Sequence, residues 1–322
     1  TMLSKYCGYD SPDELLENRK KEANKPVSNG SGILNYIVSL FKSTEVKSTT
    51  DETYLSLVKQ TISFIQKNEP LIDKFQKAIA KTKNGQQFYF ETFVNVDKLN
   101  DYYGEGLRYY LKEKSDNNSQ LFGLTLLCIR SWLTTDKEHF FRYFNEVKSK
   151  KIQQPAPVIL YARYFGVYIL DAEINKTNAD EFINDAREVH SQFLKRREHF
   201  KNFPLFEYAM AMILLCTGYF KEALYYAEYG LKNFKEMHDI DKSLCRSIEL
   251  IKSFALVKMG RRKEAEKIFN ALRPSSFYFL SRKTATIIYL VLSKHLNKTT
   301  SKTETQLNLL IEETGFKRLL LI

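Results

Sequence analysis

The sequence predicts an all-α chain, a right-handed α-solenoid of antiparallel helix hairpins, and three observations lead to this prediction. Two stretches repeat at a distance of 42 residues, Gly218–Ala223 (Gly-Tyr-Phe-Lys-Glu-Ala) and Gly260–Ala265 (Gly-Arg-Arg-Lys-Glu-Ala). Apolar residues recur at intervals of three and four through most of the chain, which is the spacing of one helix face. Strand patterns are nearly absent, and only residues 88–96 are ambiguous.

Each of the two repeats predicts a helix, a turn and a second helix. The apolar stretches are 205–216 with 220–234 in the first hairpin, and 244–255 with 265–272 in the second. Gly218 and Gly260 stand where the first helix ends, and glycine there adopts a positive φ without steric cost. Ala223 and Ala265 are small residues at the expected crossing of the two helices, so we expect both to be buried.

The pattern continues upstream in a more degenerate form and predicts about a dozen helices in all. The further apolar stretches are 55–65 with 71–79, 99–111, 121–133 with 140–147, and 158–169 with 182–193. We therefore assign residues 54–322 to one helical repeat domain. Residues 25–53 are rich in Gly, Ser, Thr and Asn, and we interpret them as a flexible linker with a short helix. Residues 1–24 are predicted to be an N-terminal helical segment.

Residues from about 205 to 274 resemble tetratricopeptide repeats. In that family a Gly precedes the second helix, a small residue comes early in it, an aromatic follows one turn later, and a Pro ends the unit. These positions hold Gly260, Ala265, Phe269 and Pro274 in the second unit. The period is 42 residues rather than about 34, and Ala227 replaces the aromatic in the first unit. The resemblance implies helix hairpins that stack into a solenoid.

The first residues resemble a segment that closes small helix-turn-helix-like domains in bacterial proteins of the Bacteroidetes group. The matching positions are Leu3, Tyr6, Gly8, Tyr9, Asp13 and Leu15. Such proteins often carry a helical-repeat region after that domain, so the resemblance implies that residues 1–24 are the remnant of a preceding domain. An ordinary capping helix is the alternative interpretation.

Positive charge gathers in the last third of the chain. Residues 201–322 hold 20 Lys and Arg against 12 Asp and Glu, which is +8 of the total of +11. The run Arg261, Arg262 and Lys263 is one of its clusters, and a basic face on a solenoid attracts an acidic peptide or nucleic-acid phosphates. Solvated helix faces are the simpler interpretation. Because Glu264 and Glu266 stand beside the cluster, we expect no sequence-specific binding of DNA by this chain alone. An acidic protein or peptide is the partner we expect, and nucleic acid is the less favoured one.

Aromatic residues make up 14% of the chain, and most of their rings are expected to fill the helical core. Tyr225, Tyr226 and Tyr229 are exceptions, since their pattern predicts exposed side chains. Tyr225 and Tyr229 lie one turn apart on a face distinct from that of Ala223, and we select these two as candidate partner-binding residues beside the basic cluster.

Motifs that carry chemistry are missing from the sequence: there is no H-E-x-x-H, P-loop or nucleophile-elbow pattern. We therefore predict a protein that is not an enzyme and binds no cofactor or metal. His139 is expected to be a core histidine, Asp97 to be a helix N-cap, and Trp132 to be a packing residue.

Two further patterns bear on location. The four cysteines, Cys7, Cys128, Cys216 and Cys245, stand far apart, which favours a cytoplasmic, reducing compartment. No run of about 20 uncharged apolar residues predicts a membrane span.

These observations predict a non-enzymatic helical-repeat scaffold that binds a protein or peptide on its concave surface. The alternative is the sensor or effector region of a bacterial transcription regulator. The sequence leaves the oligomeric state open.

Overall fold

The computed structural model describes residues 29–46, 48, 51–196, 204–232 and 239–322. These residues form helices and no strands, as the periodicity predicts. Contacts between helices divide the chain into two compact units, so the predicted repeat region 54–322 is shared between them. The helical segment expected at residues 1–24, and its resemblance to a preceding domain, lie outside the described residues.

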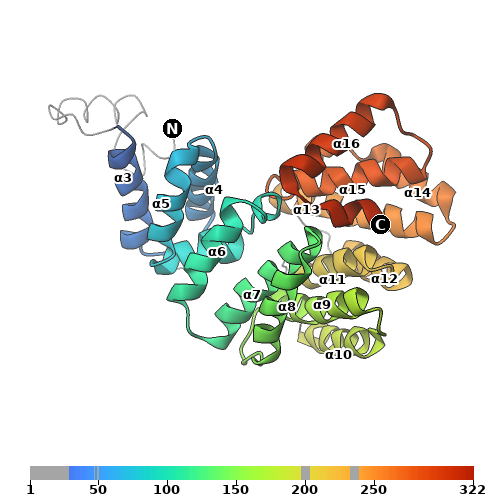
Figure 1. Cartoon of the computed structure of the whole chain (residues 1–322), viewed down its shortest axis with the longest axis horizontal. Helices are drawn as coiled ribbons and strands as arrows, with labels where there is room; N and C mark the ends of the chain where they lie inside the picture. The colour runs from blue at the N-terminus through green and yellow to red at the C-terminus, as the bar shows by residue number, and fades with distance from the viewer. Residues whose placement is uncertain (1–28, 47, 49–50, 197–203, 233–238) are drawn as a thin grey trace. The chain divides into compact units, whose positions relative to one another are not determined.

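Unit 1 comprises the helices up to residue 94 together with residues 105–113. Its elements are α3 (Asn29–Ser43), α4 (Glu52–Gln66), α5 (Glu69–Ile79), the π-helix η1 (Gly85–Thr92) and most of α6 (Tyr102–Glu113) (Figure 1). The ambiguous stretch at 88–96 is therefore helical where it overlaps η1. α3 is longer than the short helix expected in the linker and packs against α5. Its residue Phe41 is 1% exposed and lies edge-on to Tyr54 and Phe75 in an aromatic core.

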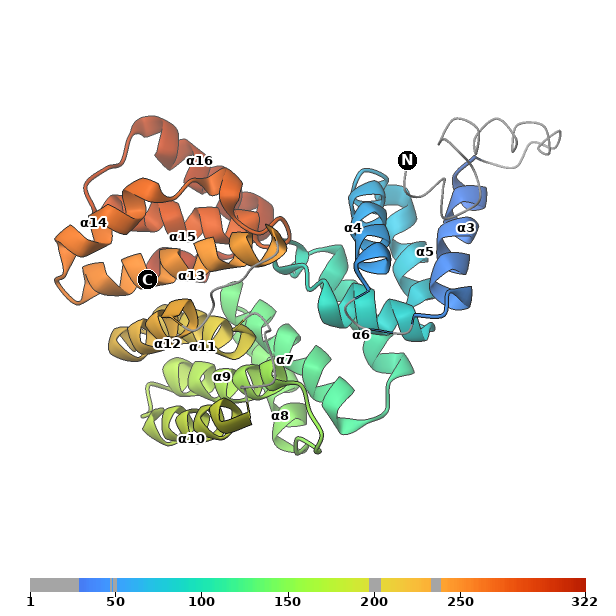
Figure 2. The same cartoon turned by 180° about the vertical axis from the view of Figure 1, so that it is seen from behind.

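Unit 2 comprises residues 95–104 and 114–322. Its elements are η2 (Val96–Lys98), α7 (Asn117–Leu133), α8 (Lys137–Lys148), α9 (Val158–Asn175), α10 (Asp180–Arg196), α11 (Leu205–Cys216), α12 (Phe220–Lys232), α13 (Asp239–Lys258), α14 (Arg262–Ala271), η4 (Pro274–Ser276), α15 (Arg282–His295), α16 (Ser301–Thr314) and η5 (Lys317–Leu321). Each odd-numbered helix from α7 to α15 packs against the helix that follows it (Figures 1 and 2). The odd-numbered helices also contact one another in sequence, α7 with α9, α9 with α11, α11 with α13, and α13 with α15.

The two repeated turns have the same geometry. Gly218 and Gly260 have φ values of 86° and 78°, in the region that favours glycine. The backbone N–H of the next residue returns to the last turn of the helix in both, from Tyr219 to the carbonyl of Leu214 and from Arg261 to that of Leu256, each at 2.9 Å. Such bonds satisfy carbonyl groups that a helix end leaves unpaired. The 42-residue repeat of the sequence is therefore a repeat of backbone structure.

Asp97 caps a helix, but not the one that follows it in the chain. Its own short helix η2 is capped by Asn95, whose side chain accepts from the backbone of Lys98 at 3.2 Å. The Asp97 carboxylate instead accepts from the backbone N–H groups of Lys283 and Thr284 at the start of α15, both at 2.8 Å. The side chain of Ser281, the N-cap residue of α15, makes no such bond. The acceptor thus comes from a residue 186 positions earlier.

We expect Ala223→Leu and Ala265→Leu each to lower the free energy of unfolding by about 1–3 kcal/mol, because extra methylene groups at a closed helix crossing force the backbone to move. Both alanines are 0% exposed. Ala271→Leu, at the exposed end of α14, is the matched control and is expected to change stability little. Urea unfolding followed by circular dichroism measures all three variants. Equal stability of all three variants would contradict the placement of Ala223 and Ala265 at closed helix crossings.

Asp97→Ala is expected to lower the free energy of unfolding by about 1–2 kcal/mol, because two N–H groups at the start of α15 lose their acceptor. Glu313→Ala is the control, since it removes only the exposed ion pair between Lys283 and Glu313 and is expected to cost less than about 1 kcal/mol. Thermal unfolding of the full chain compares the two variants. A larger loss in Glu313→Ala than in Asp97→Ala would refute the capping role.

Candidate interaction surface

Tyr225 and Tyr229, the two tyrosines selected from the sequence, lie on α12 and surround the ring of His190 on α10. Their ring centroids are 6.4 and 5.1 Å from that of His190, and both rings stand edge-on to it. Tyr225 is 41% exposed, and Tyr229 is half-buried. The guanidinium carbon of Arg187 lies 5.1 Å from the centre of the Tyr225 ring. The structure thus brings both tyrosines together on the side of α12 that faces α10.

Tyr226 was expected to be exposed, and this prediction is wrong because its side chain is 0% exposed. One residue along a helix turns about 100° around its axis, which carries Tyr226 from the surface beside Tyr225 into the interior. Its ring lies 6.0 Å from that of Phe206 and 5.2 Å from that of His190. Burial raises the pKa of Tyr226, and its hydroxyl has no hydrogen-bond partner among the described residues.

His190 forms a buried pair with Glu207 at the centre of this aromatic cluster. Its Nε2 lies 3.1 Å from Oε1 of Glu207, and the two side chains are 3% and 2% exposed. The ring of Phe206 stacks on that of His190 at 5.3 Å with an interplanar angle of 10°. The pair ties α10 to α11 through polar atoms that water does not reach, so it is a structural element of unit 2.

The expectation that His139 is a core histidine is wrong. Its side chain is 38% exposed, and Nδ1 lies 2.8 Å from Oδ2 of Asp136. Asp136 is the N-cap of α8 and accepts from the backbone of His139, so the histidine stands in the first turn beside its cap. The buried histidine is His190, which we did not select from the sequence. Its position among Phe193, Phe206 and the tyrosines depends on helices that only tertiary packing brings together.

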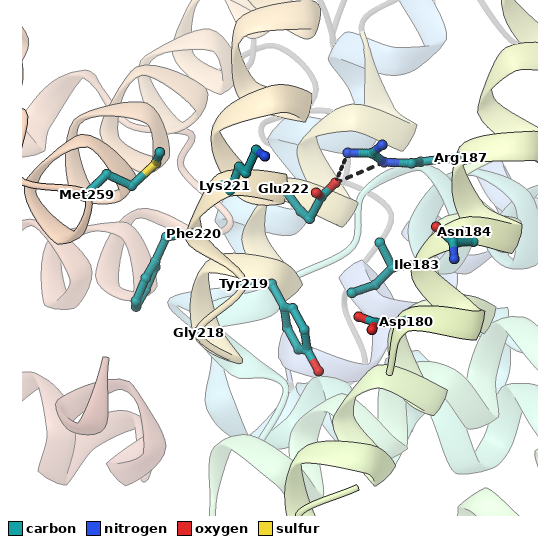
Figure 3. A pocket seen from close by; sticks show the side chains of 10 residues that line it. All are labelled: Asp180, Ile183, Asn184, Arg187, Gly218, Tyr219, Phe220, Lys221, Glu222 and Met259. Atoms are coloured by element: carbon teal, nitrogen blue, oxygen red, sulfur yellow. Dashed lines mark hydrogen bonds and ion pairs between the residues drawn. The ribbon is translucent and has the colours of Figure 1, made fainter. Parts of the chain in front are cut away.

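An open pocket of about 580 Å³ lies beside Arg187. Its walls come from the first turns of α10, the turn at Gly218, the start of α12, and Met259 (Figure 3). Nε of Arg187 donates to Oε2 of Glu222 at 2.9 Å, so the guanidinium and the carboxylate of the wall compensate each other. The pocket therefore presents no excess of one charge to a ligand.

The basic cluster at the start of α14 is largely paired. Arg261 donates to Glu264 at 2.8 and 2.7 Å, and Arg262 pairs with Glu266 at 3.1 Å. Arg262 also donates to the carbonyl of Leu296 at 2.6 Å, beyond the C-terminal end of α15. Lys263 is exposed. Arg261 also stands within reach of α12, because Glu228, the residue before Tyr229, adds to the effect of Glu264 in raising the pKa of Arg261.

A further surface runs along α11. Tyr208, Met212 and Cys216 follow one another at steps of four residues, which puts them on one helix face, and each is half-buried. We call this row, with Arg163 of α9, the inner face of unit 2. The hydroxyl of Tyr208 lies close to Ser247 of α13 and to Ser281 before α15. Residues from three helices therefore meet here, although their positions in the sequence have no common spacing.

Two segments of the chain itself lie against the odd-numbered helices. In the first, at η2, the backbone N–H of Asp97 donates to the carbonyl of Leu280 at 3.0 Å, and Asn100 accepts from Nε of Arg130 at 3.2 Å. The second follows α16, where Leu319 is 1% exposed and η5 contacts α7 and α15. Its residue Arg318 forms an ion pair with Glu173 of α9.

Trp132 is buried at 4% exposure, which confirms that it is a packing residue. It also carries polar contacts that the sequence does not indicate. Its Nε1 donates to Oε2 of Glu173 at 3.0 Å, and the guanidinium carbon of Arg318 lies 5.2 Å from the ring. The three side chains fasten the segment after α16 to the last turns of α7 and α9.

Among the residues that the structure describes, no group of three or more His, Cys, Asp or Glu side chains is placed to hold a metal ion. In that same part of the chain, no helix has the length and apolar character needed to cross a membrane. Cys128, Cys216 and Cys245 are free thiols, while Cys7 lies outside the described residues. Burial raises the pKa of Cys216 to about 12, which keeps this thiol protonated at neutral pH.

Comparison with protein-family models gave no match, and searches among curated proteins and solved structures gave none either.

Tyr226→Phe is expected to leave the free energy of unfolding unchanged or to raise it by about 1 kcal/mol, because it removes a buried hydroxyl that forms no hydrogen bond. Glu207→Ala is expected to lower it by about 1–3 kcal/mol, because His190 then loses its buried partner. Urea unfolding of both variants tests the assignment. A clear loss of stability in Tyr226→Phe would mean that the hydroxyl has a partner.

Proposed function

We propose that unit 2 is a tetratricopeptide-like right-handed α-solenoid and that it acts as a non-enzymatic scaffold for a protein or peptide. The sequential contacts of the odd-numbered helices support the repeat, because first helices of successive hairpins form one layer in such stacks. The equal turns at Gly218 and Gly260 support it as well. The free thiols are consistent with a reducing cytoplasm, where we place the protein.

The observation that carries the proposal is the way unit 2 holds its own short segments. The segment at η2 is fixed by a backbone hydrogen bond to Leu280 and by the Asp97 carboxylate. The segment after α16 is fixed by a buried leucine, Leu319, and by an arginine paired across two helices. Main-chain hydrogen bonds, apolar anchors and charged contacts are recurring means of peptide recognition. Their presence beside the odd-numbered helices supports peptide binding by this layer.

The inner face suits an acidic partner. It combines the cation of Arg163 and the hydroxyl of Tyr208 with the apolar side chain of Met212. One carboxylate acts on it: Asp97, which is buried and accepts from the start of α15, adds to the effect of burial in raising the pKa of Tyr208. Interface cores are enriched in Tyr, Met and Arg and depleted of acidic residues. By contrast, the arginines of the 261–263 cluster are paired with glutamates and contribute less free positive charge than their number indicates.

The alternative function, a sensor or effector region of a transcription regulator, has its support in the resemblance of residues 1–24 to a segment that closes helix-turn-helix-like domains. In that reading the inner face binds the signal, and the preceding domain contacts DNA.

Selection of 12-residue peptides from a displayed library against the full chain tests the scaffold. We expect the enriched peptides to be acidic and to bind more weakly as salt rises, because salt screens charges beyond roughly 8 Å at physiological ionic strength. Met212→Glu, on the inner face, is expected to weaken binding at least about tenfold. The new glutamate repels the acidic peptide, and its carboxylate loses water when the peptide binds. Met259→Glu is the control. It makes the same change at a residue that is 40% exposed and lines the pocket beside Arg187.

Fluorescence anisotropy with a selected peptide measures the affinities, and circular dichroism verifies that both variants fold. Loss of binding in Met259→Glu but not in Met212→Glu would move the site to the pocket beside Arg187. Failure to enrich any peptide would refute the scaffold. Nanomolar, sequence-dependent binding of duplex DNA by the full chain would favour the regulator instead.

A further inference from the structure

Arg163 of α9 has a guanidinium atom that is buried without a partner among the described residues. Its Nη1 atom is buried and has no hydrogen-bond partner, and no ion pair joins its guanidinium to any acid among the described residues. Its guanidinium makes a cation–π contact instead: the guanidinium carbon lies 5.0 Å from the centre of the Phe122 ring on α7. Burial lowers the pKa of Arg163 to about 10, so the side chain still carries its charge at neutral pH.

Such an arrangement costs stability. A guanidinium loses its hydration when it is buried, and a contact with an aromatic face restores only part of it. Buried charges in proteins are therefore paired, and an exception requires an explanation. The other arginines named above have partners of the ordinary kind, Glu222 for Arg187, Glu264 for Arg261 and Glu173 for Arg318.

Hydroxyl groups surround the same place. The phenol of Tyr208 lies near Arg163, and burial raises its pKa to about 12, so it is a neutral donor at neutral pH. Ser247 and Ser281 lie close to the Tyr208 hydroxyl but form no hydrogen bond of acceptable geometry, and both Oγ atoms are buried. Donors that form no hydrogen bond among the described residues thus come from Arg163 of α9, Ser247 of α13 and Ser281 in the turn before α15. The guanidinium of Arg163 and the hydroxyls of Ser247 and Ser281 are donors of the kind that bind an oxyanion.

We propose that Arg163, together with the hydroxyls of Tyr208, Ser247 and Ser281, binds a carboxylate of the acidic peptide partner. Charge favours a carboxylate group over a phosphate group, because one guanidinium balances the single negative charge of each carboxylate group, whereas a phosphate group carries about 1.5 to 2 at neutral pH. Arg163 as a whole is half-buried, whereas its Nη1 atom is buried. This inference rests on the proposed scaffold function and names the chemistry of its central contact.

Titration of the full chain with sodium glutarate and with inorganic phosphate, at constant ionic strength set by sodium chloride, tests the site. The readout is the Nε–H resonance of Arg163 in protein labelled with ¹⁵N-arginine, assigned by its absence from Arg163→Lys. We expect glutarate to shift this resonance in a saturable manner and to raise the melting temperature, and phosphate to do neither. The resonance of Arg142, an exposed arginine on α8, is the internal control and is expected to stay unchanged.

Two variants separate binding from packing. Arg163→Met is expected to melt higher than the wild type in chloride alone, because it removes an unpaired buried charge, and to lose the rise in melting temperature with glutarate. Its affinity for a selected acidic peptide is expected to fall about 10- to 150-fold, the loss that follows removal of a charged hydrogen bond. Arg163→Lys keeps the charge without the planar fork and is expected to retain a weaker, still saturable response to glutarate.

The site is refuted if glutarate leaves the Arg163 resonance unchanged, if Arg142→Met abolishes the effect of glutarate as fully as Arg163→Met does, or if phosphate binds more tightly than glutarate. Peptides that lose affinity in Met212→Glu but bind Arg163→Met as tightly as the wild type would overturn this inference and leave the scaffold intact. A chain that enriches no peptide overturns the scaffold, and with it the peptide as the source of the carboxylate.

Discussion

The carboxylate of Asp97 at the start of α15 is the contact on which the arrangement of unit 2 depends. A helix begins with N–H groups that have no partner within the helix, and α15 has no side chain of its own that accepts from them. Asp97 supplies the acceptor from η2, which precedes α6 in the chain. The burial this requires raises the pKa of Asp97, and the hydrogen bonds from Thr284 and Lys283 oppose that rise. The short helix η2 and the last hairpin of unit 2 are therefore joined directly.

A second junction acts in the same direction. Arg318, which follows α16, meets Trp132 and Glu173 at the last turns of α7 and α9. Both junctions place a short segment, η2 or the residues after α16, against the layer of odd-numbered helices. This layer therefore contacts parts of the chain that lie outside the helix hairpins. The polar residues of the inner face, Arg163 and Tyr208, lie in this same layer. The contacts that hold the two short segments and the proposed binding residues thus lie on the same layer of helices.

The aromatic residues divide into two roles by position on the helix. Tyr226 and Phe206 fill the interior around the pair of His190 and Glu207, whereas Tyr225 keeps 41% of its surface exposed and contacts Arg187. The cluster therefore connects a buried polar pair to the surface through neighbouring rings. Its charged groups are compensated, as are the arginines at 261 and 262. Arg163, unlike Arg187, Arg261 and Arg318, has no ion pair with an acid among the described residues, and this contrast favours the inner face as the place where an acidic group is bound.

The sequence by itself determined the helical class, the two turns at Gly218 and Gly260, and the burial of Ala223 and Ala265, because these depend on spacing and backbone conformation within one hairpin. Its periodicity also located most helices. It did not reveal that Asp97 caps α15, that His190 rather than His139 is buried, or that Tyr226 is interior. Each of these depends on a partner from another helix. Local patterns specify which face of a helix is apolar, but tertiary packing decides which distant side chain meets a given polar atom.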